Sequence, residues 1–247
     1  CFKSVKMYFQ FFKRHFNIPI ASRLLKVLLS IDLLFVLLHA LFVFLVFKRI
    51  NLNWSIAPFY LNNDDGYPEM FQYLQFVIGI IILIRLFIKT KKMGYISWLI
   101  LFVLMLLDDS LRFHERFGSW ITEKFNYSPM LGLRAQDFGE LTYVAVFGSI
   151  LIFFLVIGYY YGDKKYRRIA VDLGLLFAVF LFFGIGIDIL HEFINHNRYS
   201  LLFIVLLEDG GEMIVLSCFI WYLYFILVKP ADYNVYLFQY FHKHKLK

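Results

Sequence analysis

Three acidic clusters interrupt the apolar runs of this chain, and two of the clusters carry histidine. Carboxylates and imidazoles are the side chains that bind Zn, Fe or Mn and that move protons in enzymes. The clusters are Asp108, Asp109, His114 and Glu115; then Asp188, His191 and Glu192; and then Glu208, Asp209 and Glu212. These residue types predict one polar site assembled from three separate segments of the chain.

Charge balance favours a metal ion at this site. A charged carboxylate at mid-bilayer costs roughly 2.5–3.5 kcal/mol on insertion scales. Arg112 and Arg116 can neutralise only two of the eight carboxylates, so the others must be protonated, hydrated or bound to cations. We therefore expect one or two divalent ions, Zn, Fe or Mn. The predicted ligands are Asp108, Asp109, Glu115, Asp188, His191, Glu208, Asp209 and Glu212.

Helical spacing assigns roles to the histidines. Asp188 and His191 have the i, i+3 spacing found in carboxylate-bridged di-metal bundles. We predict that His39 and Glu192 are the catalytic or supporting groups beside the ligands. His114 is expected to point away from the site, because a continuous helix would place it off the face that carries Asp108.

The elements that must position these residues are membrane helices. Of the 247 residues, 61% are hydrophobic and 17% are charged, and the mean hydropathy is +0.67. A soluble domain is closer to half apolar and a quarter charged. Six runs reach the length of about 20 residues that a bilayer requires, and they lie near 24–47, 71–89, 95–116, 139–161, 170–194 and 201–228. The predicted fold is an all-α, polytopic membrane bundle.

The same reading divides the chain into three parts. Residues 1–22 mix basic and aromatic side chains, which is typical of an amphipathic segment on a membrane surface. The six-helix transmembrane domain is expected over 23–228, and a basic tail over 229–247. The lipid bilayer is therefore the expected partner, together with possible subunits of a membrane complex.

Basic residues set the expected orientation. The four segments 1–26, 85–92, 162–168 and 229–247 hold 18 of the 25 Lys and Arg residues. Cytoplasmic segments carry such an excess, so both termini are expected inside, with all three clusters in the outer half of a bacterial inner membrane. Because the net charge of +7 comes from the ends of apolar runs, we exclude nucleic acid as a partner.

The sequence indicates where the polar site lies more clearly than it indicates what the site does. The chain has no His-Glu-x-x-His and no Gly-x-Ser-x-Gly motif. Carboxylates beside histidine favour a metal-dependent membrane enzyme that acts on a lipid-like or small substrate. The alternative is a non-catalytic accessory or structural subunit. A proton or cation transporter is a third hypothesis, disfavoured because the inner half is expected to be nearly bare of polar residues apart from Asp32.

Overall fold

The computed structural model describes residues 18–49, 55–130, 133–187, 189–190 and 198–229. These ranges form helices and no β-strand, apart from an isolated bridge between Met130 and Leu133. The elements are α2 (Pro19–Phe47), η1 (Ala57–Phe59), α3 (Tyr67–Thr90), α4 (Gly94–Leu111), α5 (Phe113–Phe125), α6 (Ala135–Tyr160), α7 (Lys164–Leu181), the π-helical segment η2 (Phe182–Ile187) and α9 (Arg198–Val228).

The predicted helical bundle is confirmed. Six helical stretches of the described chain are long and apolar enough to cross a membrane. The positions of both termini relative to a membrane stay predictions, and the segments expected over 1–22 and 229–247 lie almost entirely outside the described residues.

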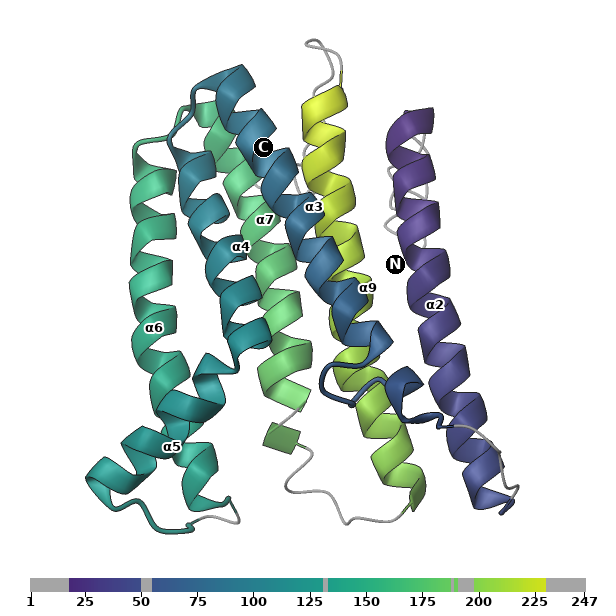
Figure 1. Ribbon diagram of the computed structural model, residues 1–247. Helices are drawn as coiled ribbons and strands as arrows, with labels where there is room; N and C mark the ends of the chain where they lie inside the picture. Colours follow the sequence, from purple (N-terminus) through teal and green to yellow (C-terminus); the bar gives the residue numbers. More distant parts are fainter. Residues whose placement is uncertain (1–17, 50–54, 131–132, 188, 191–197, 230–247) are drawn as a thin grey trace, which may run out of the picture.

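Helix α9 forms the core of the bundle. It lies between α2 and α7 and behind α3, whereas α2 and α6 occupy opposite edges (Figure 1). In the most apolar window of α9, 61% of the residues are buried, against 11% in α6. Phe219 of α9 makes edge-to-face contacts with Trp98 and Phe102 of α4 at 5.7 and 5.1 Å between ring centres. A helix that is apolar on every side lies either in a protein core or against lipid, and α9 has the first position.

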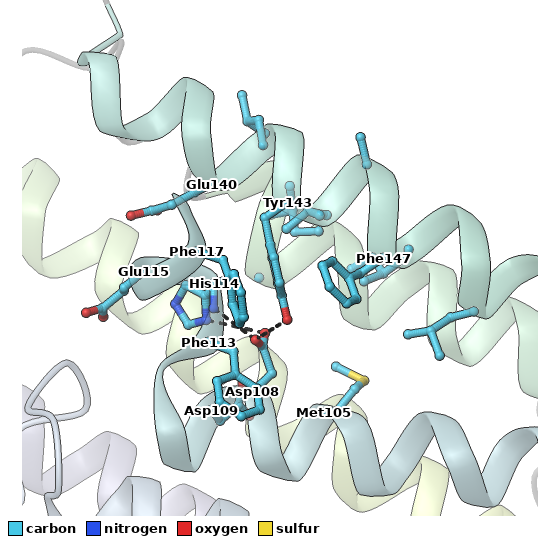
Figure 2. Close-up of a pocket in the computed structure, with 18 of the residues that line it drawn as sticks. Met105, Asp108, Asp109, Phe113, His114, Glu115, Phe117, Glu140, Tyr143 and Phe147 are labelled. Carbon is cyan, nitrogen blue, oxygen red and sulfur yellow. Dashed lines mark hydrogen bonds and ion pairs between the residues drawn. The ribbon is translucent and has the colours of Figure 1, made fainter. Parts of the chain in front are cut away.

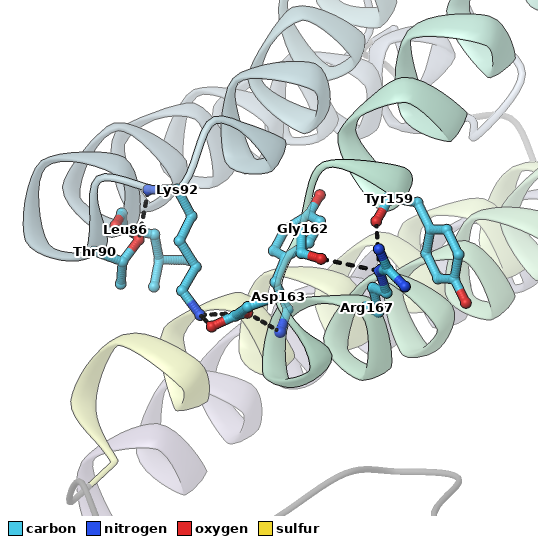
Figure 3. Close-up of polar contacts among 8 residues, drawn as sticks. Leu86, Thr90, Lys92, Tyr159, Gly162, Asp163 and Arg167 are labelled. Carbon is cyan, nitrogen blue, oxygen red and sulfur yellow. Dashed lines mark hydrogen bonds and ion pairs between the residues drawn. The ribbon is translucent and has the colours of Figure 1, made fainter.

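Lys92 and Arg167 lie at one end of the bundle, which we call the Lys92 end (Figure 3). Lys92 after α3 pairs with Asp163 at 2.8 Å, and this pairing lowers the pKa of the Asp163 carboxyl. Asp163 also accepts the Tyr166 N–H at 2.7 Å, which caps the start of α7. The Arg167 guanidinium donates to the carbonyls of Tyr159 and Gly162 at 3.2 and 2.9 Å, so the last turn of α6 is capped by a cation.

The opposite end, which we call the α5 end, departs from the sequence prediction. The third run was expected to continue as a helix to residue 116, but α4 ends at Leu111 and Arg112 has a left-handed backbone, with φ 52°. The Arg112 guanidinium contacts Asp64 and Asp65, each at 3.2 Å, in the loop before α3. This loop contact and the left-handed residue separate α5 from α4, so the prediction of one continuous helix is wrong.

Two glycines allow α5 to cross α6 closely. A Cβ on Gly139 of α6 would overlap the carbonyl oxygen of Gly118 on α5. A Cβ on Gly118 would in turn lie 2.9 Å from the backbone nitrogen of Glu140. Only residues without a side chain permit this approach. The crossing brings the first turns of α6 over the end of α4, where the acidic residues lie.

Candidate functional site

A cavity of about 1000 Å³ lies between α4, α5, α6, the α7–η2 helix and α9 (Figure 2). Its walls along the helices are apolar, and its polar groups gather toward the α5 end. The apolar walls include Leu101, Leu104, Val144, Phe147, Leu151, Phe177, Phe180 and Leu181. The polar lining is Asp108, Asp109, His114, Glu115, Arg134, Gln136, Asp137, Glu140, Tyr143, Ser149, Glu208 and Glu212.

Asp108 is the centre of the polar end. Its Oδ1 accepts the Tyr143 hydroxyl at 2.9 Å and the backbone N–H of His114 at 3.0 Å, and its Oδ2 lies 3.3 Å from His114 Nδ1. The hydroxyl and the imidazole of these residues both face the carboxylate in Figure 2. Because each partner acts as a donor, the arrangement suits an ionised Asp108 and a His114 that carries a proton on Nδ1.

The contact with Asp108 changes the acid–base behaviour of His114. The hydrogen bond to this carboxylate raises the pKa of His114 above its ordinary value of 6.5, while burial acts in the opposite direction. Nε2 of the same ring has no hydrogen-bond partner in the described part of the chain, and His114 lines the cavity. The structure therefore presents a His–Asp pair with one imidazole nitrogen available to a bound molecule.

Glu212 enters the cavity from α9. Its Oε2 accepts the Gln72 side-chain amide at 3.0 Å, which links α9 to α3. Its carboxylate lies directly against η2, because a Cβ on Gly184 would overlap it. Glycine is needed at this position for the close approach of the carboxylate to the backbone.

Negative side chains outnumber positive ones around the cavity. Seven carboxylates line it, whereas its basic side chains are Arg134 and His114. Arg134 forms an ion pair with Asp137 at 2.7 Å, and the two residues cap the start of α6. Glu140, one turn further along, accepts the Gln136 amide at 2.8 Å. The cavity therefore offers an acidic surface to whatever it binds.

The structure brings five of the eight predicted metal ligands to this cavity: Asp108, Asp109, Glu115, Glu208 and Glu212. Asp209 is not among the residues that line it. Asp188, His191 and the predicted catalytic Glu192 lie outside the described residues. Among those that are described, no three His, Cys, Asp or Glu side chains converge closely enough to hold a metal ion.

The two histidines lie where the sequence did not place them. His39 was expected near the ligands, but it is buried in α2, where its Nδ1 accepts the Leu61 N–H at 3.0 Å and its ring meets Tyr60 edge-on. These contacts hold the loop after η1 against α2, and His39 does not line the cavity. His114 was expected to point away, and that prediction is wrong, because the break at Arg112 turns its side chain toward Asp108.

Sequence reasoning missed Tyr143 and Gln72. Both are uncharged residues of largely apolar helices, and each has its partner on a different helix. The position of Tyr143, four residues after Gly139, provides no separate signal. Only the crossing of α5 and α6 makes it a neighbour of Asp108.

Residues 70–228 match a family model described as "Domain of unknown function (DUF8692)". The chain belongs to this family. The DUF8692 region contains every residue that lines the cavity, whereas α2 precedes it. No curated protein and no solved structure matches the chain.

Proposed function

We propose that the protein is a membrane-embedded enzyme that binds a lipid-like molecule in the cavity and acts on its polar part with His114 and Asp108. One observation carries this proposal: a single cavity joins long apolar walls to a His–Asp pair. Ligand sites combine mostly apolar walls with a few convergent polar groups in the same way. The confirmed set of six apolar helices supports a bilayer as the surroundings.

The shape of the cavity supports an amphipathic ligand. From Tyr143 to Ile152, α6 contributes to the wall over about 13 Å of helix, given a rise of 1.5 Å per residue. Phe147, Ile150 and Ile152 line the cavity and are 44%, 49% and 53% exposed. An apolar wall that is accessible in this way would give a ligand a route from the bilayer to the polar end.

The acidic lining favours a ligand that brings positive charge. A headgroup with an amine would satisfy this requirement, and so would a divalent ion bound with the headgroup. A resident Zn, Fe or Mn ion is part of the same proposal, with Glu208 and Glu212 as the described ligands that face the cavity. When bound, such an ion supplies a Lewis acid for the polar part of the substrate.

The chemistry proposed for the chain itself is proton transfer at His114 Nε2. Asp108 holds the other ring nitrogen and orients the imidazole. Because the pKa of His114 is raised, its protonated form persists to higher pH than that of an ordinary histidine, and this form can donate a proton to an oxygen of the bound polar group. After the transfer, Asp108 is still bonded to Tyr143, so the carboxylate keeps its position.

Filling the cavity tests the proposal. A Cβ on Gly148 of α6 meets no atom within 4 Å, and Gly148 lines the cavity, so Gly148→Leu should fill it without distorting the helix. Gly174 of α7 also meets no atom within 4 Å but does not line the cavity, which makes Gly174→Leu the matched control.

Purified proteins would be analysed by mass spectrometry of extracted lipid and by rebinding of that lipid after its removal. We expect at least a ten-fold weaker affinity for Gly148→Leu and unchanged affinity for Gly174→Leu. Turnover of the bound lipid, read from its products, should be lost in His114→Asn while binding remains. Equal binding by both leucine variants and the wild type would overturn the lipid proposal.

The distribution of charge supports an orientation with the α5 end outside. Lys92, Lys164 and Lys165 lie at the Lys92 end, and basic residues favour the cytoplasmic side. In a bacterial inner membrane, the polar end of the cavity would then face outward. Single cysteines near Asp64 should react with an impermeant reagent added outside whole cells, and those near Lys165 only after lysis.

A further inference from the structure

A second polar group lies in the middle of the bundle, away from the cavity lining. Asp32 of α2, Gln75 of α3 and Ser217 of α9 are each completely inaccessible to solvent. The Gln75 amide nitrogen donates to Asp32 Oδ1 at 3.0 Å and to Ser217 Oγ at 2.8 Å. The Ser217 hydroxyl donates to Asp32 Oδ2 at 2.6 Å. We call these three residues the Asp32 triad.

The Asp32 triad contains no positively charged side chain. No Lys, Arg or His pairs with Asp32 in the described part of the chain. The titratable group that faces Asp32 from α9 is the thiol of Cys218; α3 presents only the Gln75 amide. An ionised carboxylate without a counter-charge is costly in the middle of a membrane. Protonation of the Asp32 carboxylate removes this cost.

One atom of the triad is unsatisfied. Gln75 Oε1 is buried and has no hydrogen-bond partner among the described residues. Both triad donors point at Asp32, which is the arrangement of the ionised acid. Once Asp32 carries a proton, a half-turn of the Gln75 amide would bring Oε1 to the carboxyl, where it can accept the new O–H. The triad can therefore hold Asp32 in either protonation state.

Polar pairs lie on both sides of the triad along α9. Glu212 with Gln72 is toward the α5 end, and Gln72 and Gln75 are one helical turn apart on α3. Toward the Lys92 end, the Tyr222 hydroxyl donates to Asp172, and both side chains are buried. Glu212, Ser217 and Tyr222 follow one another at intervals of five residues, or about 7.5 Å of helix.

These groups lie on different sides of α9, because five residues turn a helix by about 140° beyond a full turn. They correct an expectation from the sequence. The inner half was expected to be nearly bare of polar residues apart from Asp32, which argued against conduction. Asp172 and Tyr222 lie there as well, in contact across α7 and α9. Beyond them at the Lys92 end, burial lowers the pKa of Lys229 to about 8, so this amine can exchange a proton near neutral pH.

We propose that Asp32 is a proton-binding site in the middle of a proton path that runs along α9 from the α5 end toward Asp172. In the inward direction, a proton reaches Asp32 from the α5 end, an O–H bond forms on the carboxylate, and the bond breaks as the proton passes on toward Tyr222 and Asp172. Each passage moves one positive charge across the bundle. This activity goes beyond the lipid chemistry proposed for the cavity and does not depend on it.

Proton flux into liposomes tests the path. Vesicles with the reconstituted protein and an enclosed pH-sensitive dye would be driven by a potassium gradient with valinomycin. We expect proton flux well above that of protein-free vesicles, and at least a ten-fold decrease in Asp32→Asn, which keeps the size of the side chain. Asp163→Asn, which changes a carboxylate in the α6–α7 loop, should behave as the wild type.

Infrared spectroscopy detects the protonation of the Asp32 carboxylate directly. The difference between acid and alkaline samples should contain a carboxyl C=O signal that is lost in Asp32→Asn and shifted in Ser217→Ala. If Asp32→Asn does not fold, as judged by gel filtration and thermal unfolding, Tyr222→Phe supplies the same flux test by removing one hydroxyl. Flux absent from the wild type, or unchanged in the variants, would overturn the path whatever the infrared result.

Discussion

The Tyr143 hydroxyl and the Asp108 carboxylate are joined by a hydrogen bond of 2.9 Å that connects α6 to α4. This bond lies at the polar end of the cavity, where Asp108 also contacts His114. Tyr143 packs at the same time against Phe147, with 4.4 Å between ring centres. The residue therefore belongs to both the apolar wall and the acid–base pair.

Removing the hydroxyl of Tyr143 should destabilise the protein while its ring packing is kept. Hydrogen bonds to charged groups contribute about 1.5–3 kcal/mol, so Tyr143→Phe should lower the free energy of unfolding by about 1–2 kcal/mol, given the remaining donors to Asp108. Thermal unfolding in detergent measures this change. Tyr160→Phe, at an exposed position on the same helix, is the control and should unfold as the wild type does.

Stability should fall on the alkaline side because of His114. Its pKa in the folded protein is raised above 6.5 by the bond to Asp108, so the ion pair is fully present below pH 6.5 and is lost as the pH rises through the raised pKa. The melting temperature of the wild type should decrease over this interval, and that of His114→Asn should change less. Parallel curves for the two proteins would contradict the assignment.

Gly184 should tolerate no side chain. A Cβ there overlaps the Glu212 carboxylate, so Gly184→Ala must displace either η2 or Glu212. Overpacking of this kind costs about 1–3 kcal/mol. Gly148→Ala, where a Cβ meets open space, is the matched control and should be neutral or slightly stabilising. Both variants would be compared by thermal unfolding, and equal stability would mean that Glu212 does not lie against η2.

The metal prediction concerns Asp188 as well as Glu212. Gently purified protein should carry one or two equivalents of Zn, Fe or Mn, measured by elemental analysis. Asp188→Ala and Glu212→Ala should each lose metal and melt at a lower temperature, because an ion that binds only the folded state stabilises it. Asp137→Ala, which removes a carboxylate already engaged by Arg134, should keep the metal. Wild-type protein without metal, and with unchanged melting in chelator, would refute the prediction.

The sequence predicted the helices well because membrane spans depend on apolar length alone. The runs expected at 24–47 and 71–89 correspond to Pro19–Phe47 and Tyr67–Thr90. The break at Arg112 was missed, because a left-handed residue held by a distant loop leaves no mark in the apolar pattern. That single error also caused the wrong orientation of His114.

The sequence predicted residues of the candidate site only where charged side chains interrupt the apolar runs. Asp108 and Glu212 stand out in the sequence because carboxylates are rare in apolar runs, and both line the cavity. Gln75, Ser217 and Tyr222 are uncharged, and each has meaning only through a partner on another helix. Such pairings depend on how the helices are rotated against one another, and this rotation cannot be inferred from the apolar pattern of the sequence.

The exposed position of α6 changes how affinity should be understood under the proposed function. Phe147 and Ile150 of this helix line the cavity, and Val146 and Phe153 beside them are exposed, so under the proposal a ligand can arrive from the lipid without dissolving in water. Occupancy then follows the mole fraction of the ligand among the surrounding lipids, and the aqueous concentration matters only through partitioning. Diluting the protein with inert lipid should empty the site even when the total amount of ligand is held constant.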